Sequence, residues 1–158
     1  MTVLVGVAIA VALIGRERSL ELALGPIDRT AIDFATLDRG QRRNDFLMCP
    51  DDLCAAASDE NSPVFDAPVT EMRDRWMEMI DRQPRVELVA ADGDALQYDF
   101  VQRSQLFRFP DTVTVRFVER SGGGSTLAVY SRAHYGISDF GVNRQRVVDW
   151  LAALPGGT

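Results

Sequence analysis

The second half of the chain is dominated by positions that alternate between apolar and polar residues. This alternation runs through residues 86–90, 96–101, 112–117 and 127–132, and a period of two is typical of strands with one buried face. Asp92-Gly93-Asp94 predicts a hairpin turn between the first two strands, and the glycines of segment 121–125 predict a turn between the last two. We expect Leu106 to Phe109, between the second and third strands, to be extended as well.

Two segments have helical spacing instead. Apolar residues recur every three or four positions from Thr70 to about Arg82, where Thr70 can serve as the N-cap and Pro84 ends the helix. A second amphipathic pattern leads to Leu154 and is closed by Pro155 and two glycines. The order is therefore helix, about four strands, helix.

Short turns between successive strands predict an antiparallel sheet, and two amphipathic helices can cover one of its faces. We predict an α+β fold with an antiparallel sheet of about four to six strands and the helices on one face. Residues 33–154 form the single domain, after an apolar segment (1–15) and a linker (16–32), and before a short tail (155–158). Residues 41–68 lack periodicity and are expected to be an irregular arm over the core.

An uninterrupted apolar run, from Thr2 to Ile14, precedes this domain. As a helix it would reach only about 20 Å, which is short of a bilayer's hydrocarbon core of about 30 Å. It fits a short membrane anchor, a secretion signal that lacks its usual basic start, or a buried segment, and we favour the anchor. We expect the domain to lie in the periplasm; because Arg16 and Arg18 follow the run, the cytoplasmic face is the alternative.

The net charge of the chain limits the classes of partner that it can bind. The net charge is −6, which argues against nucleic acid because that binding requires excess positive charge. All 17 basic residues are arginine, a bias that a GC-rich genome explains better than a ligand does, so the arginine count by itself supports no ligand. We expect no cofactor.

Cysteine and histidine are scarce. Cys49 and Cys54 could close a small disulfide loop, or both could stay reduced. Together with the single histidine, His134, they cannot supply the four ligands of a structural zinc site, so we expect no metal. We interpret His134, beside an aromatic residue, as structural.

The stretch YSRAHYGISDFGVNRQRVVDW, from Tyr130 to Trp150, concentrates polar and charged groups around a turn between a strand and a helix. Together with RSQLFRFPDTVTVRFV and PVFDAP (63–68), it resembles the bacterial and plastid family catalogued as domain of unknown function 1499. The resemblance covers about Asp33 to Leu154 and implies a small domain, often behind a signal or anchor. It implies no reaction, and His134 departs from the more usual arginine-like residue of the family.

Our main hypothesis is a noncatalytic envelope module that binds a small anionic or amphipathic ligand, or a partner protein, in a groove between the sheet and its arginines. The candidate ligand-binding residues are Arg103, Arg108, Ser131, Arg132, Tyr135, Asp139, Asn143 and Arg144. The alternatives are an enzyme with acid/base chemistry at Asp139 and Asp111, and a structural assembly factor. Asp139 is explained equally well as a helix cap, and no residue is assigned a catalytic role.

Overall fold

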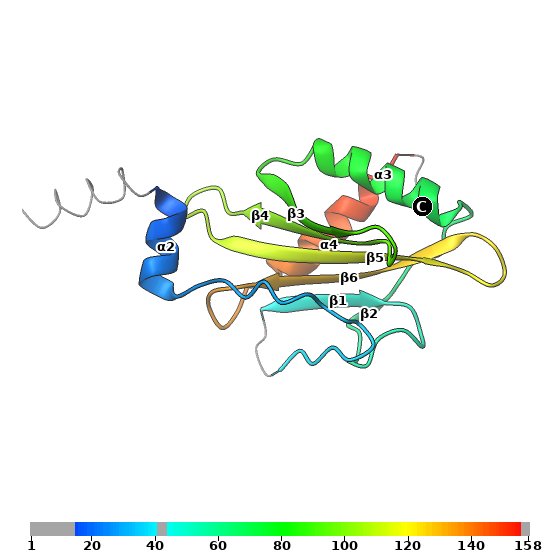
Figure 1. Ribbon diagram of the computed structural model, residues 1–158, viewed down its shortest axis with the longest axis horizontal. Coiled ribbons are helices and arrows are strands. Elements are labelled where there is room, and N and C mark those ends of the chain that lie inside the picture. The colour runs from blue at the N-terminus through cyan, green and yellow to red at the C-terminus, as the bar shows by residue number, and fades with distance from the viewer. Residues whose placement is uncertain (1–14, 41–43, 156–158) are drawn as a thin grey trace, which may run out of the picture.

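The computed structural model describes the backbone of residues 15–40 and 44–155 (Figure 1). The elements in chain order are α2 (Arg16–Leu24), β1 (Asp45–Cys49), β2 (Glu60–Asn61), α3 (Val69–Asp81), β3 (Val86–Asp92), β4 (Gln97–Arg103), β5 (Pro110–Glu119), β6 (Ser125–Ala133) and α4 (Val142–Ala152). The N-terminal apolar segment, apart from Gly15, lies outside the described residues. Within the described residues, no helix is both long and apolar enough to cross a bilayer.

The strands form one six-stranded sheet in the order β2-β1-β6-β5-β4-β3. All neighbours are antiparallel except β1 and β2, which pair in parallel. The sheet is therefore mixed at one edge, and the predicted α+β class and strand number are confirmed.

Both amphipathic helices pack on one face of the sheet, as the sequence predicts. Trp76 of α3 and Trp150 of α4 meet edge to face with ring centroids 5.9 Å apart, and Phe117 of β5 contacts Trp76 at 6.0 Å in the same way. These rings lie in one buried cluster with the inward side chains of β4, β5 and β6. Aromatic pairs of this geometry add to the stability that area burial provides.

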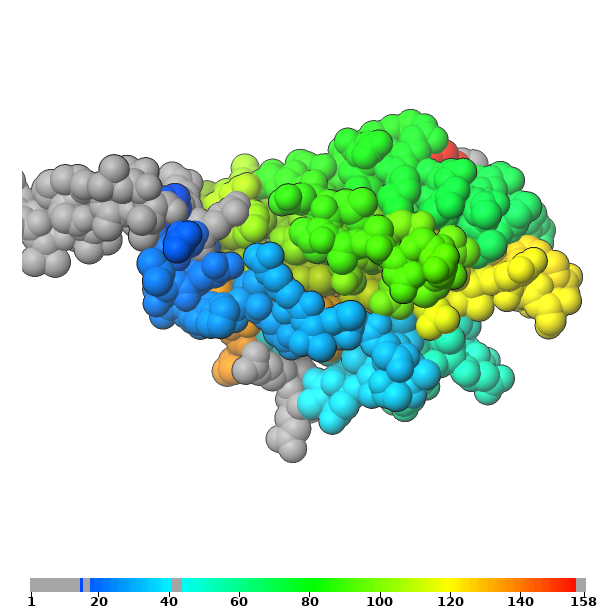
Figure 2. All heavy atoms as spheres, in the orientation of Figure 1, coloured from blue at the N-terminus to red at the C-terminus, as the bar shows by residue number. Residues whose placement is uncertain are grey.

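The opposite face is covered by chain without regular structure. Alternation along β6 turns Ala128, Tyr130 and Arg132 to this side. Phe34 and Leu37 pack there with Ala128 and Tyr130 in a smaller buried cluster. Figure 2 shows the residues that follow α2 (blue) lying across this face. These residues cover only part of this sheet face, and a groove lies on the uncovered part.

Several local predictions are wrong. The arm expected at 41–68 contains β1 and β2, because the five residues of β1, four of them apolar, pair with β6 far along the chain. Residues 105–107 form a turn, where an extended segment was expected. The helix α3 begins at Val69 after Pro68, without a side-chain cap from Thr70, and α2 occupies the first part of the expected linker.

The structure joins Cys49 to Cys54 in a disulfide, with Cα atoms 6.3 Å apart. Cys49 ends β1, and the bond ties the following loop to that strand. The question that the sequence left open is thereby answered in favour of the disulfide.

Candidate functional site

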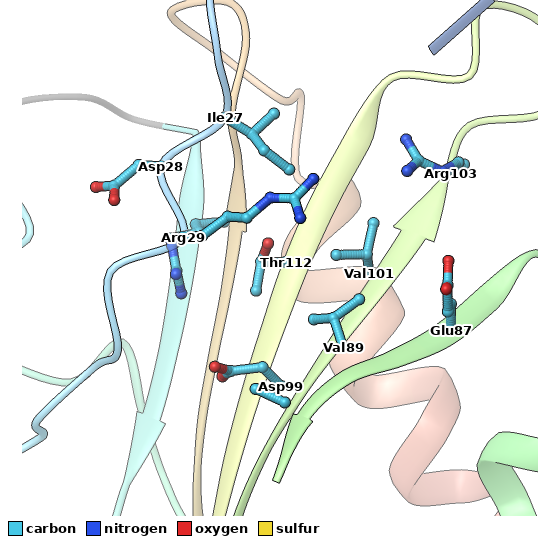
Figure 3. Close-up of a pocket in the computed structure, with 11 residues that line it drawn as sticks. Ile27, Asp28, Arg29, Glu87, Val89, Asp99, Val101, Arg103 and Thr112 are labelled. Atoms are coloured by element: carbon cyan, nitrogen blue, oxygen red, sulfur yellow. The ribbon is translucent and has the colours of Figure 1, made fainter. Parts of the chain in front are cut away.

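A groove of about 350 Å³ lies on the sheet face opposite α3 and α4. On one side it is bounded by the strap, which we define as residues 25–31, and on the other by β3, β4, β5 and β6. In Figure 3, Ile27, Asp28 and Arg29 come from the strap, while Glu87, Asp99 and Thr112 come from the strands. Two contacts hold the strap over the sheet: Tyr135 Oη donates to the Gly25 carbonyl at 2.8 Å, and Gln97 Nε2 donates to the carbonyl of Ile32, just beyond it, at 2.7 Å.

Arg132 of β6 is a half-buried cation of this groove. Its Nη1 donates to Thr114 Oγ1 at 3.2 Å, and its guanidinium carbon lies 5.4 Å from the centre of the Tyr130 ring. Among the described residues, no carboxylate lies within ion-pair distance of this guanidinium. Burial lowers the pKa of Arg132, and this effect outweighs the opposite influence of the nearby Asp99 and Asp28.

The groove also carries acidic groups. Asp28, Glu87 and Asp99 line it together with Arg29, Arg103 and Arg132. Thr114 Oγ1 donates to Asp99 Oδ1 at 2.6 Å while it accepts from Arg132. The lining is thus of mixed charge, whereas the sequence predicted a groove with an apolar floor and a rim of arginines.

A second hollow, of about 520 Å³, adjoins the first and shares Asp28 and Arg132 with it. His134 lines this hollow, and its Nε2 lies 2.6 Å from Thr112 Oγ1. Burial, with help from nearby Arg132, lowers the pKa of His134 to about 4. The imidazole is therefore neutral at neutral pH and takes part in a hydrogen bond within the fold, which agrees with a structural interpretation.

Three of the predicted site residues lie on the helix side of the sheet instead. Ser131 Oγ donates to Asn143 Oδ1 at 2.6 Å, and Arg146 of α4 donates to both. Asp139 accepts from the backbone N–H of Asn143 at 2.8 Å and from its side-chain amide. These groups anchor the turn between β6 and α4 to the core, and Asp139 satisfies an N–H group at the start of the helix.

The two carboxylates proposed for acid/base chemistry are both engaged in these internal contacts. Asp111 forms an ion pair with Arg146, although burial still raises the pKa of Asp111. Asp139 is not the N-cap of α4, which is Gly141, but it accepts from the backbone N–H of Asn143 in the first turn, as described above. The arrangement gives both groups a role in holding the fold together.

The remaining predicted residues are dispersed. Tyr135 borders the second hollow and holds the strap, while Arg144 pairs with Glu60 at 2.5 Å on the surface. Arg108 lies in the β4–β5 turn with a φ of 60°. Only Arg103 and Arg132 of the predicted set line the groove itself.

Sequence reasoning missed the acidic side of the groove and the strap. Asp99 and Thr112 could have been found, because alternation places them on the same sheet face as Arg132. Asp28 and Arg29 could not, since nothing in the sequence shows that a non-periodic segment folds back over the strands. Within the described part of the chain, no group of three or more His, Cys, Asp and Glu residues is placed to hold a metal ion.

The family model described as "Protein of unknown function (DUF1499)" matches residues 47–154. The chain belongs to the DUF1499 family. The matched range starts within β1 and includes the rest of the sheet and both packed helices, but not the strap. Membership confirms the resemblance seen in the sequence and assigns no activity. No curated protein and no solved structure matches this chain.

Proposed function

We propose that this DUF1499 protein is a noncatalytic module of the bacterial envelope that binds a small anionic or amphipathic ligand beside Arg132. The observation that carries the proposal is the half-buried guanidinium without a carboxylate partner among the described residues. A desolvated cation is costly unless it is paired, and a ligand carboxylate or phosphate would supply the direct ion pair that Asp99 and Asp28, although nearby, do not form.

The surroundings of Arg132 support a ligand of small size. A groove of about 350 Å³ falls at the lower end of the range of pockets that hold small molecules. Val89 and Val101 contribute apolar surface, which suits an amphipathic molecule. Asp99 and Glu87 on the same walls would repel a ligand with several negative charges, so a single anionic group fits better.

The proposed location is a membrane tether with the domain in the periplasm. The Cys49–Cys54 disulfide supports this, because such bonds persist in oxidising compartments and are rare in the bacterial cytosol. The apolar run from Thr2 to Ile14 supports the tether. On the cytoplasmic face, the alternative, the cysteines of the native protein would be reduced.

Native mass spectrometry of the full chain, gently extracted from its own host, tests the ligand. We expect a reproducible added mass that is absent after denaturation and absent from the Arg132→Gln variant. Arg116→Gln is the matched control, since Arg116 of β5 lies on the same face of the sheet as Arg132 but does not line the groove. An added mass equal in both variants, or none in the wild type, refutes the proposal. A co-extracted protein in place of a small mass would identify a partner protein as the occupant instead.

A further inference from the structure

Three separate segments place large apolar side chains in solvent at one end of the domain. We define the apolar end as the exposed residues Leu22, Leu24, Leu106, Phe107, Phe109, Ile137, Phe140 and Val142. They belong to α2, to the β4–β5 turn, and to the β6–α4 turn with the first residue of α4. Figure 1 shows these three segments at the same end of the molecule, opposite the β5–β6 turn.

Side-chain contacts make this end continuous. Phe107 and Phe109 stack with ring centroids 5.6 Å apart, and Phe109 meets the edge of the Tyr135 ring at 6.1 Å. Tyr135 in turn donates to the carbonyl of Gly25, which follows α2. The β4–β5 turn, the β6–α4 turn and the end of α2 are therefore one connected surface.

The degree of exposure cannot be explained by folding alone. Phe140 is 96% exposed, Ile137 85%, Leu106 76% and Phe107 66%. Single exposed apolar residues are ordinary, but a group of large ones at the tips of turns indicates a surface that contacts a membrane or another protein.

We propose that the apolar end rests on the lipid bilayer, with Phe107, Ile137 and Phe140 inserted among the lipid headgroups and upper acyl chains. The sequence indicates that a bilayer covers this surface. The apolar run ends at Ile14, two residues before α2 begins, and α2 is part of the apolar end. A bilayer that holds this run must therefore lie within a few residues of the apolar end. Phe, Leu and Ile are also the residues that interfacial segments bury at the boundary between headgroups and acyl chains.

This inference rests on the proposed membrane tether and not on the ligand at Arg132. Its test uses tryptophan as a depth probe, because the native Trp76 and Trp150 are buried and give a constant background. Phe107→Trp and Phe140→Trp are made separately in the full chain, so that a change in the Phe107 stack cannot decide the result. Val64→Trp is the matched control, an exposed apolar position beside Phe65, which pairs with Ser125 at the opposite end of the sheet.

Each variant is reconstituted into vesicles of phosphatidylcholine with brominated acyl chains and collected by flotation. Zwitterionic lipid avoids repulsion of a chain with net charge −6. We expect the added emission at positions 107 and 140 to be quenched and shifted to shorter wavelength, and the emission at position 64 to match that in unbrominated vesicles.

The other outcomes overturn the inference in distinguishable ways. If the variants float but the emission at positions 107 and 140 is no more quenched than that at position 64, the apolar end does not contact the bilayer, and the inference is refuted while the membrane tether is supported. If the chain does not float at all, the tether is refuted as well. Arg132→Gln must leave flotation and quenching unchanged, because the groove ligand has no part in either.

Discussion

Replacement of Arg146 by Met should destabilise the domain far more than any other arginine substitution near the predicted site. Arg146 is only 8% exposed, and it donates to Gln102, Ser131, Asn143 and Asp111. Methionine fills the space but leaves these acceptors without their donor. Breaking a buried ion pair by removing one partner costs about 3–5 kcal/mol of unfolding free energy.

We expect a cost in the lower part of this range, because Asp111 can take up a proton and so avoid being a buried, unpaired charge. Burial already raises the pKa of Asp111 in the presence of Arg146, and losing that cation raises it further. A carboxyl with a higher pKa in the folded state is most favourable at acidic pH. The deficit of Arg146→Met should therefore grow with rising pH, by at most about 1.4 kcal/mol per unit, between the folded pKa of Asp111 in the wild type and its higher folded pKa in the variant.

Urea unfolding of the full chain in mild detergent, followed by the emission of Trp76 and Trp150, measures these free energies. Arg132→Gln is the comparison, since it removes a cation whose one hydrogen bond to the described residues is the 3.2 Å contact with Thr114; we expect a loss below about 1 kcal/mol. Adding Asp111→Asn to Arg146→Met should recover part of the lost stability, because the buried charge is gone.

The reasoning is refuted if Arg146→Met lies within 1 kcal/mol of the wild type, given the cost of about 3 kcal/mol expected for an orphaned buried charge. It is also refuted if Arg132→Gln costs as much as Arg146→Met. The second result would make Arg132 part of the structural framework and remove the basis for a ligand there.

Three further outcomes follow from the structure. Reduction of the Cys49–Cys54 disulfide should lower the unfolding free energy by about 2 kcal/mol, as chain entropy predicts for so short a loop, and a double serine variant should not respond to reductant in the same assay. Gly124→Ala should lower the melting temperature sharply, because its Cβ would lie 2.3 Å from the Phe65 carbonyl oxygen, whereas Gly123→Ala, with open space and a similar φ, should lose only about 1 kcal/mol; equal losses would contradict the clash. Because the pKa of His134 is lowered to about 4, the unfolded chain takes up a proton near pH 6.5 and the folded chain does not. The unfolding free energy should therefore fall as the pH is lowered from 7 to 4.5. After allowance for partial exposure, we expect this fall to be about 1–2 kcal/mol larger than in the His134→Gln variant. Parallel urea midpoints for the two proteins over this range would disprove that coupling.

The local pattern of the sequence determined the parts of the fold whose signal is local. Alternation at residues 112–117 and 127–132 predicted β5 and β6, because each strand buries one face and the side-chain period is two. Helical spacing predicted α3 and the covering of one sheet face by both helices. The family resemblance also rested on contiguous residues, and the match over residues 47–154 confirmed it.

Tertiary structure alone decided which of the polar residues share a surface. Ser131 and Arg132 are neighbours in sequence, yet alternation sends the first to the buried network of Arg146 and the second to the groove. The strap reaches Arg132 only because chain more than one hundred residues earlier folds across the sheet, a contact that no local period encodes. For the same reason β1 was missed: five residues carry too little pattern of their own, and their pairing with β6 supplies the hydrogen bonds that make them a strand.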